Sequence, residues 1–129
     1  MDKQKMDLQL LIKNIRKNPE ISKSILTVKL KKESPKKIHA KIRKHKFIFD
    51  KPKALGGMDV GPTSAEMLLA STGACMISVL EVWANILEID IKNIEANIFG
   101  TIDHRGRLGI SEDVFPGLQN INIDFKIDT

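Results

Sequence analysis

Residues 63–88 decide the fold of this chain and read TSAEMLLASTGACMISVLEVWANILE. From position 67 to 87 only Glu81 is charged, so the segment is apolar almost all round, which is typical of a helix buried on several sides. Thr63 followed three residues later by Glu66 is the pattern of a capping box, in which the two residues satisfy each other's free backbone N–H groups. We therefore predict a long, buried central helix over 63–88 that starts at Thr63.

A membrane-spanning helix is the alternative for the same segment, because its apolar part is about as long as a bilayer is thick. Polar side chains interrupt the apolar surface at Ser71, Thr72, Ser78, Glu81 and Asn85. No aromatic belt or basic anchor follows the segment, as would be typical of a helix that ends at a membrane interface. We therefore expect a core helix and no membrane partner.

Upstream of the helix, residues 21–50 show the period-two alternation of apolar and polar residues that predicts β-strands. We expect strands over 25–30, 38–43 and 47–49, with a lysine-rich turn over 31–37 between the first two. In the second of these strands the apolar residues Ile38, Ala40 and Ile42 alternate with His39, Lys41 and Arg43. The alternation predicts one wet, lysine-rich face and one buried face.

The two ends of the chain add a helix and further strands. An amphipathic pattern predicts a first helix over 3–17, within an N-terminal segment 1–18, which ends because Pro19 disfavours helical backbone in the residue before it. Strands are expected over 94–127, the last one alternating from Ile121 to Ile127. Helices and strands are segregated along the chain, which favours an antiparallel α+β fold in one domain of 129 residues.

The charges divide unevenly along the chain. Residues 1–53 hold 17 basic and 5 acidic side chains, a net charge of +12, and residues 54–129 hold 4 and 11, a net charge of −7. Such a split is explained by a nucleic-acid patch, or by a basic half that folds against or dimerises with an acidic half. The scarcity of aromatic residues for stacking on bases, and the lack of a helix-turn-helix or RNA-binding motif, argue against nucleic acid.

Cys75 is the only cysteine of the sequence. It excludes an internal disulfide, and no Cys/His cluster has the spacing of zinc ligands, so we expect no metal and no cofactor. The N-terminal sequence lacks the apolar core and cleavage site of a signal peptide. These features predict a reducing, cytoplasmic location.

Three stretches of sequence resemble the OsmC/Ohr family. Residues 50–75 read DKPKALGGMDVGPTSAEMLLASTGAC, residues 100–109 read GTIDHRGRLG, and residues 116–121 read PGLQNI. The first resembles the family's Gly-Gly-x-Asp-x-Gly-Pro loop followed by a helix with Gly-Ala-Cys, and the others resemble its next strand and Pro-Gly turn. The resemblance implies an intertwined homodimer in which long helices lie between two antiparallel sheets, with the reactive cysteine in a pocket at the subunit interface.

The resemblance also implies a chemistry, the thiol-dependent reduction of organic hydroperoxides in oxidative-stress defence. Cys75 matches the family's peroxidatic cysteine, whose thiolate attacks the peroxide and needs a nearby cation or helix N-terminus to form at neutral pH. The family's resolving cysteine has no counterpart here, so turnover requires an external thiol or a bridge between two copies of Cys75. The implied substrate is a small hydrophobic peroxide.

Two further residues are candidates for the catalytic site, Glu66 at the start of the helix and Arg43 as the activating cation. The loops that carry the family's arginine hold lysines here, namely Lys31, Lys32, Lys36, Lys37, Lys51 and Lys53. His45, Arg105 and Arg107 are further basic residues in neighbouring segments. Lysine is a poorer substitute for arginine because it lacks the planar fork of donors.

Non-catalytic interpretations of these residues remain open. A free buried cysteine often acts as a small hydrophobic residue, and Glu66 is explained by helix capping alone. On a straight helix Glu66 and Cys75 lie about 13 Å apart along the axis and on opposite sides. The alternative function is therefore a non-catalytic dimer that binds an apolar small molecule in the family's pocket.

Overall fold

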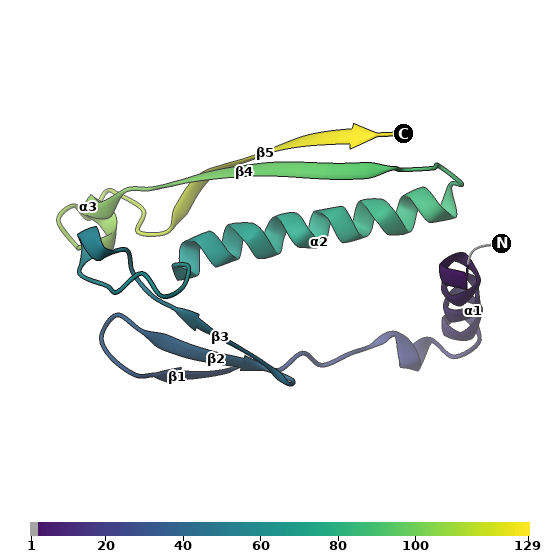
Figure 1. The fold of residues 1–129 in the computed structure, drawn as a ribbon, viewed down its shortest axis with the longest axis horizontal. Helices are drawn as coiled ribbons and strands as arrows, with labels where there is room; N and C mark the ends of the chain where they lie inside the picture. Colours follow the sequence, from purple (N-terminus) through teal and green to yellow (C-terminus); the bar gives the residue numbers. More distant parts are fainter. Residues whose placement is uncertain (1–2) are drawn as a thin grey trace.

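The computed structural model describes residues 3–129, and Figure 1 shows its course from the N-terminus to the C-terminus. Its elements follow one another in the order α-β-β-β-α-β-α-β, with two single-turn helices between them. The bounds are α1 Lys3–Lys17, η1 Pro19–Ser22, β1 Lys29–Lys32, β2 Ile38–Ile42, β3 His45–Phe49, η2 Lys53–Leu55, α2 Ser64–Ile86, β4 Asn93–Ile102, α3 His104–Arg107 and β5 Leu118–Asp128. The structure is therefore α+β with antiparallel sheets and a long helix.

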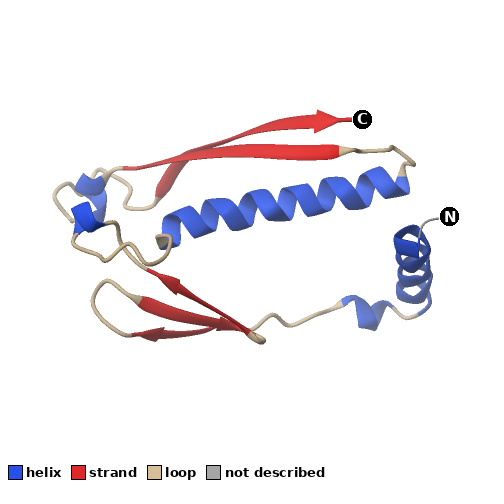
Figure 2. Ribbon diagram, viewed as in Figure 1, coloured by secondary structure: helices blue, strands red, loops and turns tan. Residues whose placement is uncertain are grey.

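The strands form two separate antiparallel sheets within the described chain. One has the order β1-β2-β3, and the other is a long two-stranded ribbon of β4 and β5 with an irregularity between Phe99 and Thr101. Figure 2 shows α2 running along β4, with the three-stranded sheet on the opposite side of the helix from the ribbon. Within the described chain, α2 packs mainly against β4.

Small residues bring α2 close to the ribbon. Gly73 is one of the two buried residues of the helix, and a Cβ added to it would lie 2.0 Å from Cδ1 of Ile98 on β4. Ala84, eleven residues later and so on the same side of the helix, is the other. The glycine of the Gly-Ala-Cys motif therefore serves the contact between α2 and β4.

The segment before β1 differs from the prediction. A strand was expected over 25–30, but β1 begins at Lys29, where it pairs with Lys41 of β2. The β2–β3 hairpin turns immediately after Ile42, so the residues before Lys29 find no partner strand among the described residues 3–129. Ile25 and Leu26 are consequently 96% and 91% exposed.

A single chain leaves the central helix largely uncovered. Only 11% of its most apolar stretch is buried. The whole chain exposes 10553 Å², whereas a compact protein of this size exposes roughly 6,900 Å². The burial inferred from sequence is therefore absent within one chain, since one ribbon covers only one side of a helix that is apolar on both.

We predict that Gly73→Leu lowers the free energy of unfolding by about 1 to 3 kcal/mol, because the new side chain overlaps Ile98. Ile98→Ala in the same chain should recover part of the loss as a favourable coupling energy. Denaturant titration of both single variants and the double variant measures this coupling. Ala74→Leu adds a similar side chain at an exposed helix position. Equal losses from Gly73→Leu and Ala74→Leu would contradict the proposed contact.

Candidate functional site

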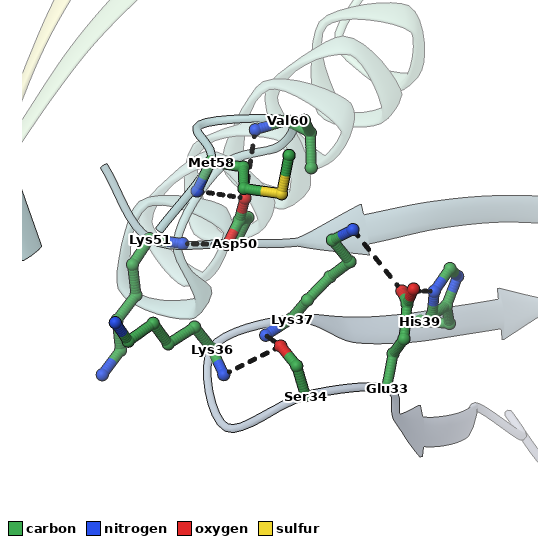
Figure 3. Close-up of polar contacts among 9 residues, drawn as sticks. All are labelled: Glu33, Ser34, Lys36, Lys37, His39, Asp50, Lys51, Met58 and Val60. Carbon is green, nitrogen blue, oxygen red and sulfur yellow. Dashed lines mark hydrogen bonds and ion pairs between the residues drawn. The ribbon is translucent and has the colours of Figure 1, made fainter. Parts of the chain in front are cut away.

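The loop between β3 and α2 is organised around one buried carboxylate. Asp50 is only 2% exposed and accepts hydrogen bonds from the backbone N–H groups of Lys51, Met58 and Val60 at 2.8, 3.0 and 3.2 Å, as Figure 3 shows. Burial acts to raise the pKa of Asp50, but these three donors lower it by more, so the pKa lies below its ordinary value of 3.8. Asp50 therefore stays ionised and ties both ends of the loop together.

Two glycines allow the loop to fold back on itself. A Cβ at Gly57 would lie 1.8 Å from the carbonyl oxygen of Lys51, and one at Gly61 would lie 2.2 Å from that of Ile48. No larger residue fits at either position without moving the backbone. The glycines of the Gly-Gly-x-Asp-x-Gly-Pro stretch are thus explained by close backbone approach.

Glu66 takes part in the capping box at the start of α2. Its carboxylate accepts from the backbone N–H and the hydroxyl of Thr63 at 2.7 and 2.8 Å, and the Thr63 hydroxyl accepts from the backbone N–H of Glu66 at 3.2 Å. The hydrogen bonds from Thr63 hold the pKa of Glu66 below its ordinary value of 4.5. The structure thus shows the capping role predicted for this residue.

Cys75 lies on an exposed apolar stripe of α2. Leu68, Cys75, Val79, Val82 and Ile86 recur at intervals of three, four or seven residues and share one side of the helix, and all five are exposed. We call these five residues the apolar stripe. Gly73 lies two residues before Cys75 and therefore faces the other way, towards β4. The thiol takes part in none of the side-chain hydrogen bonds found between residues 3 and 129.

Arg43 lies at the tip of the hairpin between β2 and β3. Ile42 pairs with His45, so Arg43 and Lys44 form a two-residue turn, and Arg43 has a positive φ of 52°, as the favoured hairpin turns require. Its side chain is exposed. Within one chain Glu66 and Cys75 lie nine residues apart on α2, whereas Arg43 lies on the β2–β3 turn, and among the described residues no hydrogen bond joins any two of the three.

A cleft of about 810 Å³ opens at the start of α2. Its walls are mostly apolar and include Ile38, Phe49 and Leu69, and Glu66 lies at its edge. Four basic residues line it, namely Lys36, Lys51, His104 and Arg107. Its volume is typical of small-molecule sites, but neither Cys75 nor Arg43 contributes to its wall.

The basic residues of the cleft come from separate parts of the chain, so no sequence motif predicts that they lie together. Lys36 donates to the carbonyl oxygen of Gly56 at 2.6 Å. Arg105, in contrast, is held by Asp103, and these hydrogen bonds lower the pKa of the Asp103 carboxyl to about 2. Arg107 rather than Arg105 is therefore the arginine available to a ligand in the cleft.

The described residues hold no metal-binding cluster and one helix of membrane-spanning length. Residues 3–129 contain no group of three or more His, Cys, Asp or Glu side chains placed to hold a metal ion. One helix, Ser64–Ile86, is long and apolar enough to cross a membrane by length and composition, a property that the core helices of soluble proteins share. That single helix is weak support for a membrane span.

We predict that Asp50→Asn lowers the melting temperature at neutral pH, because one oxygen of the carboxylate becomes an amide donor that faces a backbone donor. A carboxylate whose pKa is lowered by folding stabilises the folded state at any pH above its ordinary pKa. This stabilisation is lost as the pH falls through the folded-state pKa. The difference between the two proteins should therefore shrink below about pH 4. Thermal melts across pH measure it. Asp59→Asn in the same loop is the control, and an equal effect there would contradict the role of Asp50.

Comparison with known proteins identifies the fold. No protein-family model and no curated sequence matches the chain. Among solved structures, it is similar to a protein of Psychrobacter arcticus 273-4 described as an osmotic stress induced and detoxification response protein, with a TM-score of 0.65 and 17% identity over 83% of this chain and 73% of that one. The chain therefore has the OsmC-like α+β fold that its motifs predicted.

Proposed function

We propose that this protein is a homodimeric, cysteine-dependent peroxidase that reduces small apolar hydroperoxides with an external thiol. The observation that carries the proposal is the position of Cys75, exposed in the middle of the apolar stripe of α2 in an OsmC-like fold. An apolar surround suits an organic hydroperoxide better than hydrogen peroxide. The single cysteine and the stress-related description of the structural neighbour support a cytoplasmic role in oxidative-stress defence.

The proposed reaction balances without a metal or a second cysteine in the chain. The Cys75 thiolate attacks one peroxide oxygen, the O–O bond breaks, and the alkoxide leaves and takes a proton to become an alcohol. Sulfur is oxidised by two electrons to a sulfenic acid. One external thiol then displaces water to give a mixed disulfide, and a second thiol releases Cys75 and an external disulfide.

The second copy in this proposal covers the apolar stripe. The chain exposes roughly 3,600 Å² more than a compact protein of its size, and obligate homodimers bury roughly 1,000 to 2,500 Å² or more per partner, so the excess is large enough to supply such an interface. Because Arg43 lies apart from Cys75 within one chain, the cation beside Cys75 is supplied by the second copy in this proposal, with Arg43 as the candidate. Glu66 then acts mainly by fixing the start of the helix.

A non-catalytic ligand-binding protein is the second candidate, and the cleft favours it. The cleft has an ordinary ligand-site volume and basic residues at its wall, yet Cys75 does not line it. In this case a ligand binds equally well when the thiol is absent. The first experiment below separates the two functions.

We predict that limiting cumene hydroperoxide adds one oxygen atom to Cys75, seen as a mass shift of the intact protein and located by peptide mapping. Added dithiothreitol should reverse the shift and release the alcohol catalytically. Cys75→Ser should abolish both effects. If the parent protein is left unmodified while it still binds the alcohol, and Cys75→Ser binds it equally, the peroxidase is rejected in favour of the ligand-binding protein.

We predict that Val79→Lys weakens self-association by at least tenfold, because it places a charge in the centre of the apolar stripe. Analytical ultracentrifugation over a dilution series measures the association. Asn97→Lys, at an exposed position of β4 that points away from α2, adds the same charge and should leave the dimer intact. A monomeric parent protein, or equal weakening by both substitutions, would refute the proposed interface.

A further inference from the structure

The three-stranded sheet carries lysines in register on one face. Lys29 of β1 pairs with Lys41 of β2, and Lys41 pairs in turn with Lys46 of β3, so the three stand in one row across the sheet. Lys31 and His39 pair in the next row of the same face, because residues two apart in a strand point to the same side. All five side chains are exposed and line a shallow groove of about 220 Å³. We call these five residues the lysine face.

This arrangement does not serve the stability of the sheet. Like charges directly opposite one another on neighbouring strands are destabilising, and the row holds two such pairs. Glu33 pairs with Lys37 and His39, as Figure 3 shows. In the described chain none of the salt bridges involves Lys29, Lys41 or Lys46. The repulsion among these three lysines is therefore not offset by any acidic side chain of the described chain, and a bound anion would relieve it.

The lysine face is directed away from the apolar parts of the protein. Ile38 and Phe49 pair on the other face of the same sheet, and both line the cleft at the start of α2. At the hairpin tip, one residue pair beyond Lys41 and Lys46, Lys44 adds another exposed cation beside the lysine row. A second copy that covers the apolar stripe of α2 would therefore leave the lysine face open.

We propose that the lysine face binds the phosphodiester backbone of double-stranded nucleic acid without reading its sequence. Lysine ammonium groups act as point charges toward phosphate and lack the planar fork that reads base edges. The face carries no aromatic side chain, so it lacks the stacking platform of a single-strand binder. Its groove suits a projecting ridge of phosphates, whereas the flat surface of an anionic bilayer cannot enter it.

This function is independent of the thiol chemistry proposed above, and the test keeps the two apart. The full-length protein is titrated against a labelled, mixed-sequence DNA duplex and an RNA duplex of equal length, over a series of salt concentrations. Four lysine–phosphate contacts predict that log K falls with log salt with a slope of about −3.6. Cys75→Ser should bind as the parent does.

The decisive variant combines Lys29→Gln, Lys41→Gln and Lys46→Gln. It should reduce the slope by about 2.7 and weaken binding at moderate salt on the order of a hundredfold. Its melting temperature should equal or exceed the parent's, since repulsion has been removed. The matched control combines Lys13→Gln, Arg16→Gln and Lys17→Gln on α1, removes the same charge, and should bind nearly as the parent does.

Equal weakening by both triple variants would overturn the proposal, because total charge rather than the lysine face would then set the affinity. Lysine-dependent binding to phosphatidylserine vesicles, with neither duplex bound, would also overturn it and assign the face to membranes. If the triple variant fails to fold, Lys41→Gln alone provides the test. Its slope should fall by about 0.9, and an unchanged slope would refute the contact.

Discussion

The structure depends on a helix that is apolar on two sides in a chain that can cover only one of them. Gly73 and Ala84 let α2 approach β4 closely, and this contact fixes the covered side. The opposite side carries the apolar stripe with Cys75 and stays exposed. Both the proposed dimer and the proposed chemistry follow from this one imbalance, because whatever shelters the stripe also encloses the thiol.

The loop around Asp50 connects this helix to the rest of the fold. Its buried carboxylate gathers backbone donors from both ends of the loop, and Thr63 and Glu66 then close the first turn of α2 with their own hydrogen bonds. The cleft opens where these elements meet the ends of the two sheets. The stretch that resembles the OsmC/Ohr signature is thus explained here mainly by backbone geometry and capping, whereas Cys75 makes no side-chain hydrogen bond in the described chain.

The basic side chains of the three-stranded sheet lie together on one face, just as the apolar side chains of α2 lie together on the stripe. The excess of basic residues in the first half of the sequence became a patch only when strand pairing set Lys29, Lys41 and Lys46 side by side. The two acidic residues that line the cleft are engaged in other hydrogen bonds, since Asp50 holds the β3–α2 loop and Glu66 caps α2. The lysine face and the apolar stripe are therefore separate surfaces, and they are suited to partners of different chemistry.

The sequence by itself determined the elements that rest on local physics: the capping box at Thr63, the apolar helix, the alternating strands and the glycines of the loop. It could not place Arg43 relative to Glu66 and Cys75, because Arg43 lies on another element and the distance between separate elements depends on how those elements pack. It also predicted a strand before Lys29 that has no partner, since alternation reports a two-sided surface and not the neighbour that fills it. Only the tertiary structure decided that the strands form two sheets, that α2 is covered on one side, and that the basic residues of the cleft meet, because each of these follows from contacts between residues far apart in the chain.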